Sequence, residues 1–219
     1  MQLYLIRHAQ SENNSKPEAE RIEDPAITEL GHRQCDALSK WAASLSIDFL
    51  VTSAFLRTLQ TTSYISKATQ RPINVWRDLH EVGGCYRGHL PGQEQGAPGM
   101  SHQAILDAYP QAVVDPSIGP DGWWASRPYE TSSQAMQRAT LMLNQLMTQF
   151  GQTEQTVVAV IHADFKMCLL KLILGDAFVD GVVGPMLNTG VTRFSHTESA
   201  WRLEMLNSVT HLPTKWIAG

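Results

Sequence analysis

QLYLIRHAQ, residues 2–10, is a run of strand-forming apolar residues that ends abruptly in charge. The apolar part has the length of a buried strand, and Arg7-His8 then begins a polar segment. TVVAVIHAD, residues 156–164, repeats this pattern, because its apolar strand stops at His162 and a helical pattern follows at once. Two buried strands that both end in a histidine direct attention to the carboxyl edge of a sheet, where ligands bind in α/β proteins.

Strand and helix patterns alternate along the rest of the chain. Strands are expected over 48–52, 73–79, 191–195 and 201–206, and helices over 28–45 (with Thr28 as N-cap), 54–68, 101–109, 131–150 and 163–174. Residues 83–99 hold 6 of the 15 glycines and are expected to form a long loop. This order predicts an α/β fold, namely a three-layer α/β/α sandwich with a mostly parallel central sheet.

The composition fits one globular domain over residues 1–219. Hydrophobic residues make up 43% and charged residues 17%, which excludes a disordered chain, a coiled coil and a collagen-like rod. A net charge of −4 gives no reason to expect nucleic acid as a partner. Three separated cysteines fit neither a disulfide framework nor a zinc site. There is no apolar run long enough for a membrane span and no signal-peptide pattern, so we expect a cytoplasmic protein without a membrane partner.

Charged and polar residues follow several of the predicted strands. Arg7-His8, the segment 53–57, Glu81 and His162 all lie at or just past strand ends, so we expect them to form one site. The chain has no HExxH, GxSxG, P-loop or GxGxxG pattern. Phosphoryl transfer fits better, because arginine neutralises phosphate oxygens, a neutral imidazole attacks phosphorus and a carboxylic acid protonates the leaving alcohol. A second imidazole adds positive charge if it is protonated.

Six segments of the chain match, in order, the motifs of one enzyme family. They are LIRHAQSENN (5–14), PAITELGHRQ (25–34), SAFLRTLQTT (53–62), LHEVGGCYRG (79–88), VVAVIHAD (157–164) and NSVTHL (207–212). The first resembles the LxRHGxTxxN opening of the histidine phosphatase superfamily, which is also called phosphoglycerate-mutase-like, and the fifth resembles its VxxVSHG segment. The matches span nearly the whole chain except 89–130.

The resemblance implies a role for each matching residue. His8 is similar to the nucleophile that becomes phosphohistidine, His162 to the second histidine of the site, and Glu81 to the proton donor. The residues that resemble the family's phosphate-binding positions are Arg7, Arg57 and Asn14, with Ser11 and the backbone amide of Ala163 as further contacts.

Alanine follows both histidines, where the family usually has glycine. Ala9 and Ala163 each add a methyl group, which fits if φ stays negative and costs about 1 kcal/mol if φ is positive. Reduced or narrowed activity is therefore an alternative. The proton donor also has alternatives, because Glu12 or Asp164 could approach the same phosphate as Glu81.

The resemblance covers 82–130 worst, and we expect this segment to be an insertion over the strand carboxyl ends that sets substrate specificity. The candidate specificity residues are Tyr86, Arg87, His89 and Trp123. Trp123 and its neighbour Trp124 fit a core or loop anchor better than a substrate platform.

The function implied by the resemblance is hydrolysis of small phosphomonoesters, with a small phosphorylated metabolite as partner and with neither a metal nor another cofactor. A phosphoglycerate-type mutase on the same site is one alternative. It is disfavoured because the chain ends seven residues after His211-Leu212, whereas mutases resemble one another in a longer C-terminal tail. A catalytically weak binding or regulatory protein is the other alternative, motivated by Ala9 and Ala163.

Overall fold

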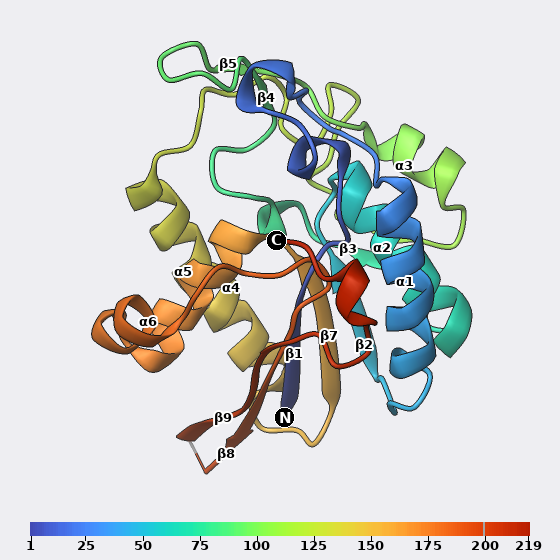
Figure 1. Ribbon diagram of the computed structural model, residues 1–219, viewed down its shortest axis with the longest axis vertical. Coiled ribbons are helices and arrows are strands. Elements are labelled where there is room, and N and C mark those ends of the chain that lie inside the picture. Colours follow the sequence, from blue (N-terminus) through green and yellow to red (C-terminus); the bar gives the residue numbers. More distant parts are fainter. Residues whose placement is uncertain (199) are drawn as a thin grey trace.

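The structure is a computed structural model that describes residues 1–198 and 200–219. A central sheet runs through it in the strand order β6-β3-β2-β7-β1-β8-β9 (Figure 1). The strands are β1 (Gln2–Arg7), β2 (Phe49–Thr52), β3 (Asn74–Val75), β6 (Val113–Val114), β7 (Thr156–Ile161), β8 (Val191–Thr197) and β9 (Ala200–Ser208). Pairing is parallel from β6 to β1, whereas β8 pairs antiparallel with both β1 and β9. The predicted, mostly parallel sheet is confirmed.

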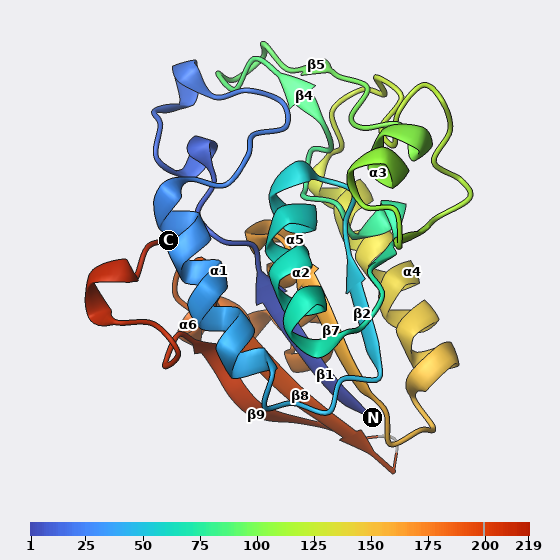
Figure 2. The same cartoon turned by 90° about the vertical axis from the view of Figure 1, so that its right-hand side faces the viewer.

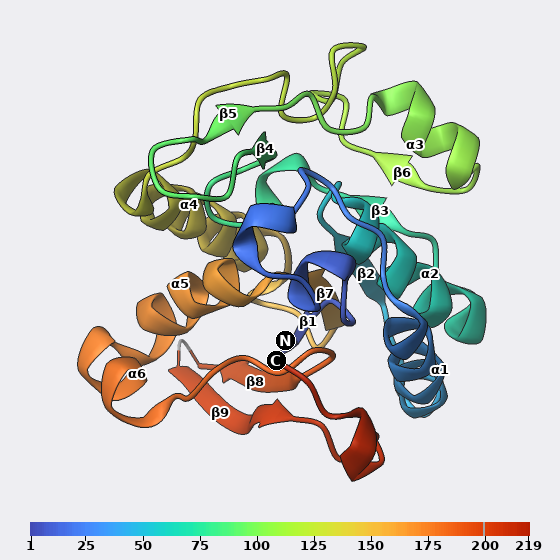
Figure 3. The same ribbon diagram turned by 45° about the horizontal axis from the view of Figure 1, so that its top comes forward.

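Helices cover both faces of this sheet (Figures 2 and 3). On one face lie α1 (Glu29–Ala42) and α2 (Leu56–Thr69). On the other lie α4 (Ser132–Phe150), α5 (Ala163–Leu174) and α6 (Asp176–Val182). This arrangement is the three-layer sandwich expected from the sequence. No helix in residues 1–198 or 200–219 is long and apolar enough to cross a membrane.

Side chains of β1 alternate between the two faces, and both faces are buried. Leu3 and Leu5 belong to the hydrophobic core beneath α4 and α5. Tyr4 and Ile6 belong to the core beneath α1 and α2. Burial on both sides explains the nearly continuous apolar sequence of the strand, and each such side chain contributes about 1.5–3 kcal/mol of stabilisation. The strand ends that carry Arg7-His8 are therefore fixed by the core.

Helix starts follow the sequence closely, while some ends and short strands do not. The Thr28 side chain accepts from the Gly31 backbone N–H at 3.0 Å and so caps α1 as predicted. The strand expected over 73–79 is only two residues long, because β3 has just two residues of β2 and of β6 to pair with. A 3-10 turn, Arg77–Leu79, follows it. Gly175 ends α5 as expected, but α6 begins directly after it and was not predicted.

Much of segment 82–130 lies beyond the carboxyl ends of the strands (Figures 1 and 3). The segment is more than the expected insertion, because its residues Val113–Val114 form β6, the edge strand of the central sheet. It contains a short antiparallel pair, β4 (Tyr86–Arg87) and β5 (Gln95–Gly96), within the stretch expected to be loop only. It also contains the helix α3 (His102–Ala108), which begins after the predicted N-terminal residue Ser101. The segment has a hydrophobic cluster of its own that joins it to the start of α2.

Candidate active site

Two histidines lie side by side at the ends of neighbouring parallel strands. His8 follows β1 and His162 follows β7, and the register of these strands pairs Arg7 with Ile161. The backbone N–H of His8 donates to the carbonyl of Ile161 at 2.9 Å. The two imidazole rings are 5.3 Å apart between centroids, in an edge-to-face orientation.

Arg57, in the first turn of α2, bridges the two histidines. Its Nε donates to Nε2 of His8 at 3.2 Å, and its Nη2 donates to Nδ1 of His162 at 3.2 Å. The guanidinium also lies over the Phe55 ring, 3.9 Å from the centroid. Both rings and the guanidinium are buried, so Arg57 places a fixed positive charge between the two histidines.

The hydrogen bonds of His8 determine which ring nitrogen is free. Nδ1 lies 2.7 Å from the carbonyl oxygen of Ala9, and because a carbonyl only accepts, Nδ1 carries the proton. Nε2 therefore holds the lone pair and points at Arg57. Burial, and then the charges of Arg57 and Arg7, hold the pKa of His8 well below its usual value. The imidazole is consequently neutral and nucleophilic at Nε2.

His162 has the opposite tautomer. Its Nδ1 accepts from Arg57, so Nε2 carries the proton and donates to Oγ of Ser53 at 2.7 Å. The Ser53 hydroxyl in turn donates to Oγ1 of Thr58 at 2.7 Å, and that hydroxyl donates to the Phe55 carbonyl at 2.8 Å. Sequence reasoning placed the segment 53–57 at the site but missed this relay, which fixes the orientation of the second histidine.

The charge of His162 differs from the protonated form considered from the sequence. Burial, and then the cationic Arg57 and the neighbouring His8, lower the pKa of His162 well below its usual value. The ring is therefore neutral while no anion occupies the site. A phosphate dianion would raise this pKa again, because an opposite charge nearby favours the protonated form.

Arg7 supplies the second arginine of the site. It is 7% exposed, and its Nη1 donates to the carbonyl of Met186. Its Nε is buried and has no hydrogen-bond partner among the described residues. A buried donor of this kind is costly unless a ligand accepts from it. No three His, Cys, Asp or Glu side chains come together as a potential metal site in the described part of the chain.

The loop after β1 is built around the side chain of Asn14. Its Oδ1 accepts from the backbone N–H and the hydroxyl of Ser11, both at 3.1 Å, and from Nδ2 of Asn188 at 3.2 Å. The Asn188 Nδ2 also donates to the carbonyl of His8 at 3.1 Å. The Asn14 oxygen is therefore engaged, which leaves its Nδ2 as the group for a phosphate. The Ser11 hydroxyl is engaged within the loop, and Asn188 is a supporting residue that sequence reasoning missed.

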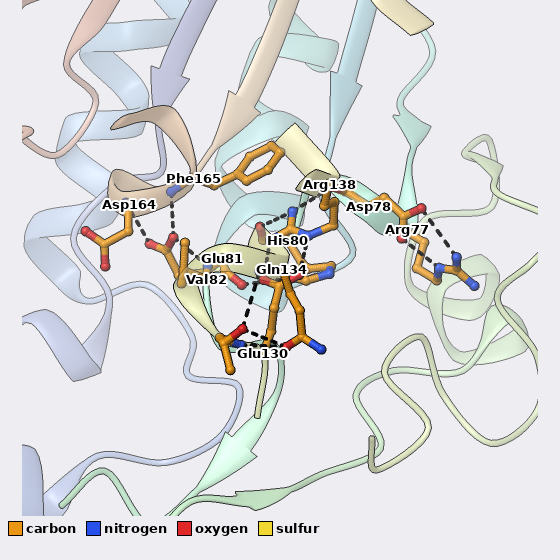
Figure 4. A network of polar contacts seen from close by, with 11 residues as sticks. Arg77, Asp78, His80, Glu81, Val82, Glu130, Gln134, Arg138, Asp164 and Phe165 are labelled. Atoms are coloured by element: carbon orange, nitrogen blue, oxygen red, sulfur yellow. Dashed lines mark hydrogen bonds and ion pairs between the residues drawn. The ribbon is translucent and has the colours of Figure 1, made fainter. Parts of the chain in front are cut away.

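The Glu81 carboxyl group lies at the N-terminus of α5, the helix that begins directly after His162 (Figure 4). Its Oε1 accepts from the backbone N–H groups of Val82 and Phe165, both at 2.9 Å, whereas Oε2 accepts only from Asp164 N–H at 3.3 Å. Burial, and then the negative charge of Asp164, raise the pKa of Glu81, while the Val82 N–H and the charge of Arg57 oppose this. Oε2 is thus the oxygen with room for a proton.

Both alanines after the histidines are accommodated without strain. Neither Ala9 nor Ala163 is among the residues with positive φ. Ala9 is fully buried, and its N–H donates to Oγ1 of Thr61 at 3.1 Å. Ala163 is the first residue of α5, so its amide is outside the intrahelical hydrogen-bond ladder and is available to an anion.

Three of the four specificity candidates lie at the surface of segment 82–130. The Tyr86 ring packs between His89 and Tyr129, with centroid distances of 4.6 and 4.9 Å. His89 Nε2 lies 3.2 Å from the carbonyl of Ile22. Tyr129 was not singled out from the sequence, and its place beside Tyr86 comes from the tertiary fold.

Trp123 lies elsewhere. It is 1% exposed, and its ring packs against Phe55 and His80 with centroids at 4.6 and 5.4 Å. A side chain this buried has no surface to offer a substrate, so the structure favours the loop-anchor interpretation over the specificity role.

Comparison with known proteins agrees with this architecture. Glucosyl-3-phosphoglycerate phosphatase of Mycolicibacterium vanbaalenii is 25% identical in an alignment 224 positions long, which covers 94% of this chain and 94% of that protein. Probable phosphoglycerate mutase GpmB of Cronobacter sakazakii is 24% identical in an alignment 220 positions long, which covers 97% of this chain and 95% of that protein. The solved structure of a mycobacterial glucosyl-3-phosphoglycerate phosphatase shares the fold, with a TM-score of 0.65 and 21% identity over 94% of this chain and 98% of that one. The family model of the histidine phosphatase superfamily, branch 1, matches residues 3–209, and the chain belongs to this family.

Proposed function

We propose that the protein is a phosphatase of small phosphomonoesters and that His8 forms a phosphohistidine intermediate. The observation that carries this proposal is the unprotonated Nε2 of His8, whose lone pair accepts from the buried Nε of Arg57 at 3.2 Å. A bound phosphate would take over this donor and leave the lone pair to attack phosphorus. A neutral, oriented imidazole beside fixed positive charge is what attack on a phosphate needs.

In the first step, Nε2 of His8 bonds to phosphorus while the bond from phosphorus to the ester oxygen breaks. Arg7, Arg57 and the N-terminus of α5 at Ala163 neutralise the non-bridging oxygens, with Asn14 Nδ2 as a further donor. His162 adds charge once the dianion has raised its pKa. All of these charges come from the protein, so we propose that no metal takes part.

Glu81 is the proposed general acid. Its raised pKa keeps a proton available on the carboxyl, and Oε2 has only one long hydrogen bond to hold it. The proton passes to the leaving alkoxide in the first step. In the second step the resulting carboxylate takes a proton from water, which attacks the phosphohistidine and releases inorganic phosphate and free His8.

The substrate is proposed to be a small phosphorylated metabolite. Segment 82–130 is proposed to determine which metabolite is accepted, and to do so as part of a single domain over residues 1–219. One relative is named a glucosyl-3-phosphoglycerate phosphatase, and the second is named a probable phosphoglycerate mutase. The second name supports one alternative, a mutase that returns the phosphoryl group to an alcohol instead of to water.

Hydrolysis of p-nitrophenyl phosphate and a panel of phosphorylated metabolites tests the proposal. His8→Ala should abolish turnover in a folded protein, whereas His102→Ala, on α3, should retain it. Dialysis against EDTA should leave the rate unchanged, and vanadate should inhibit. Turnover of His8→Ala within a few-fold of the unaltered protein would contradict the proposal, and phosphoryl transfer between phosphoglycerates that outpaces phosphate release would favour the mutase.

A further inference from the structure

A buried ion pair between Arg138 and Glu130 lies outside the catalytic centre and makes hydrogen bonds to the chain segment that carries Glu81. Arg138, on α4, faces Glu130 in a two-pronged contact, with Nε to Oε1 at 2.8 Å and Nη2 to Oε2 at 2.6 Å. The two side chains are 9% and 8% exposed. Such a fork fixes the orientation of the guanidinium plane as well as its position.

The remaining guanidinium nitrogen of Arg138, Nη1, donates hydrogen bonds to the backbone just before Glu81. Nη1 donates to the carbonyls of Asp78 at 2.7 Å and His80 at 3.0 Å (Figure 4). The guanidinium also lies over the Phe165 ring, with its carbon 4.2 Å from the centroid. Phe165 is the residue whose backbone N–H donates to Oε1 of Glu81.

The other member of the pair holds the chain just after Glu81. The backbone N–H of Glu130 donates to the carbonyl of Gly83 at 3.1 Å. The pair therefore contacts the chain on both sides of the acid, through His80 and Gly83, and it contacts the helix start that binds the carboxyl group. An ion pair that served only the stability of α4 would need none of these contacts.

We infer that Arg138 and Glu130 are positioning residues that hold Glu81 where its proton can reach the leaving oxygen. This inference rests on the proposed function, because it assigns a task to the proposed acid. Without the guanidinium, the carbonyl of His80 loses its partner and the peptide before Glu81 is free to rotate. A misplacement of about 1 Å can cost 10²-fold in rate.

The leaving group separates this role from a merely structural one. An alkyl phosphate needs the acid, because an alkoxide is a poor leaving group, whereas p-nitrophenyl phosphate hardly needs it. We therefore expect Arg138→Met to slow single-turnover phosphorylation by the alkyl phosphate at least ten-fold more than by the nitrophenyl ester. Arg138→Lys keeps the charge but loses the fork, so it should also slow the alkyl phosphate more than the nitrophenyl ester, by a smaller factor than Arg138→Met.

Two further variants keep the test sharp. Arg138→Met leaves the Glu130 carboxylate buried and unpaired, which can unfold a protein, so the double variant R138M/E130M removes both charges together. Arg193→Met is the matched control, because Arg193 also donates to a side chain, Gln2 at 3.0 Å, and lies 5.6 Å from the ring centroid of Tyr4. It should lose activity equally, if at all, on both substrates.

The inference predicts that R138M/E81Q is no slower on the alkyl phosphate than E81Q alone, because both changes remove the same step. Equal losses on the two substrates in the Arg138 variants, with E81Q still dependent on the leaving group, would overturn the inference alone. An additive loss in R138M/E81Q would do the same. Equal losses on both substrates in E81Q itself would overturn the inference together with the proposed role of Glu81.

Discussion

The two buried arginines of the candidate active site and Arg87 of the inserted segment differ in how their charge is balanced. Arg7 and Arg57 are 7% and 9% exposed, and neither takes part in an ion pair within the described residues. The Arg87 side chain is 66% exposed, and its Nε donates to Oε1 of Glu23 at 2.8 Å. Within those residues, the first two are buried without a salt bridge, since carboxylates such as Asp24 and Glu81 act on them only without direct contact, and the third is solvated and directly paired.

This difference separates a buried centre suited to binding an anion from a surface whose charged residues can change at little cost in stability. Burying a cation without a partner costs free energy, which a stable core would avoid. The buried Lys166 adds to this cost. Among the described residues its Nζ donates only to the Gly190 carbonyl, at 2.9 Å, and Arg7 is a further cation nearby. The centre therefore gives up stability for a concentrated positive charge that a phosphate can balance. Exposed charges such as Arg87 carry little of this cost.

The largest expected effect is on stability, in Lys166→Met. Burial, and then Arg7, lower the pKa of Lys166 from 10.5 to about 7. Between pH 7 and 10.5 the unfolded chain binds this proton and the folded protein does not, so the free energy of unfolding rises with pH. At pH 7 the variant should be more stable by about 2–4 kcal/mol, after allowance for the lost hydrogen bond.

Urea unfolding from pH 6 to pH 10.5 measures this effect, and the advantage of the variant should shrink towards pH 10.5. Lys171→Met is the control, because Lys171 lies on the same helix but pairs with Asp180 at the surface at 2.8 Å. A Lys166→Met protein that is less stable at pH 7 would show that the buried amine is well compensated.

The same substitution in the two regions tests the comparison directly. Arg57→Lys keeps the charge but loses the fork that reaches both histidines, so kcat/KM should fall about 10- to 100-fold, equivalent to a charge-assisted hydrogen bond of about 1.5–3 kcal/mol. Arg87→Lys should stay within about two-fold, because its ion pair is exposed. Steady-state rates on p-nitrophenyl phosphate give both values, and equal losses would remove the distinction between the regions.

The smallest expected effect concerns substrate choice, in Tyr86→Ala. The change removes the ring between His89 and Tyr129 without touching the histidines, so p-nitrophenyl phosphate turnover should stay within about three-fold. The ranking of metabolites in a substrate panel should change instead, by a few-fold in kcat/KM. An unchanged ranking would place the specificity determinants outside this aromatic group.

Much of the fold follows from local sequence patterns. The apolar runs before His8 and His162 specify strands because both strand faces are buried, and the N-cap at Thr28 is a local hydrogen bond. The strand β3 was expected but drawn too long, over 73–79, and β6 was missed, because a strand of two residues carries no periodicity. The start of α6 was missed because Gly175, which ends α5, was interpreted as the end of the whole helical region, whereas a second helix begins directly after it.

The site divides in the same way. The histidines and arginines are visible because each lies at the end of a strand or the start of a helix within a motif. Glu81 is visible from its motif, although a 3-10 turn separates it from β3. Asn188 was missed because its partner His8 is 180 residues away, and only the fold brings them together. Arg138 and Glu130 were missed for the same reason, since a helical arginine has no sequence signal that distinguishes a buried fork from a solvated side chain.

The central claim is that the phosphoryl group passes through His8. Rapid quenching of the enzyme with a ³²P-labelled phosphomonoester, followed by peptide mapping, measures this directly. The account predicts label that is stable to base and labile to acid, on the peptide containing His8, with none in His8→Ala. Label on a serine, on a carboxylate or on the His162 peptide, or full turnover without any labelled protein, would contradict it.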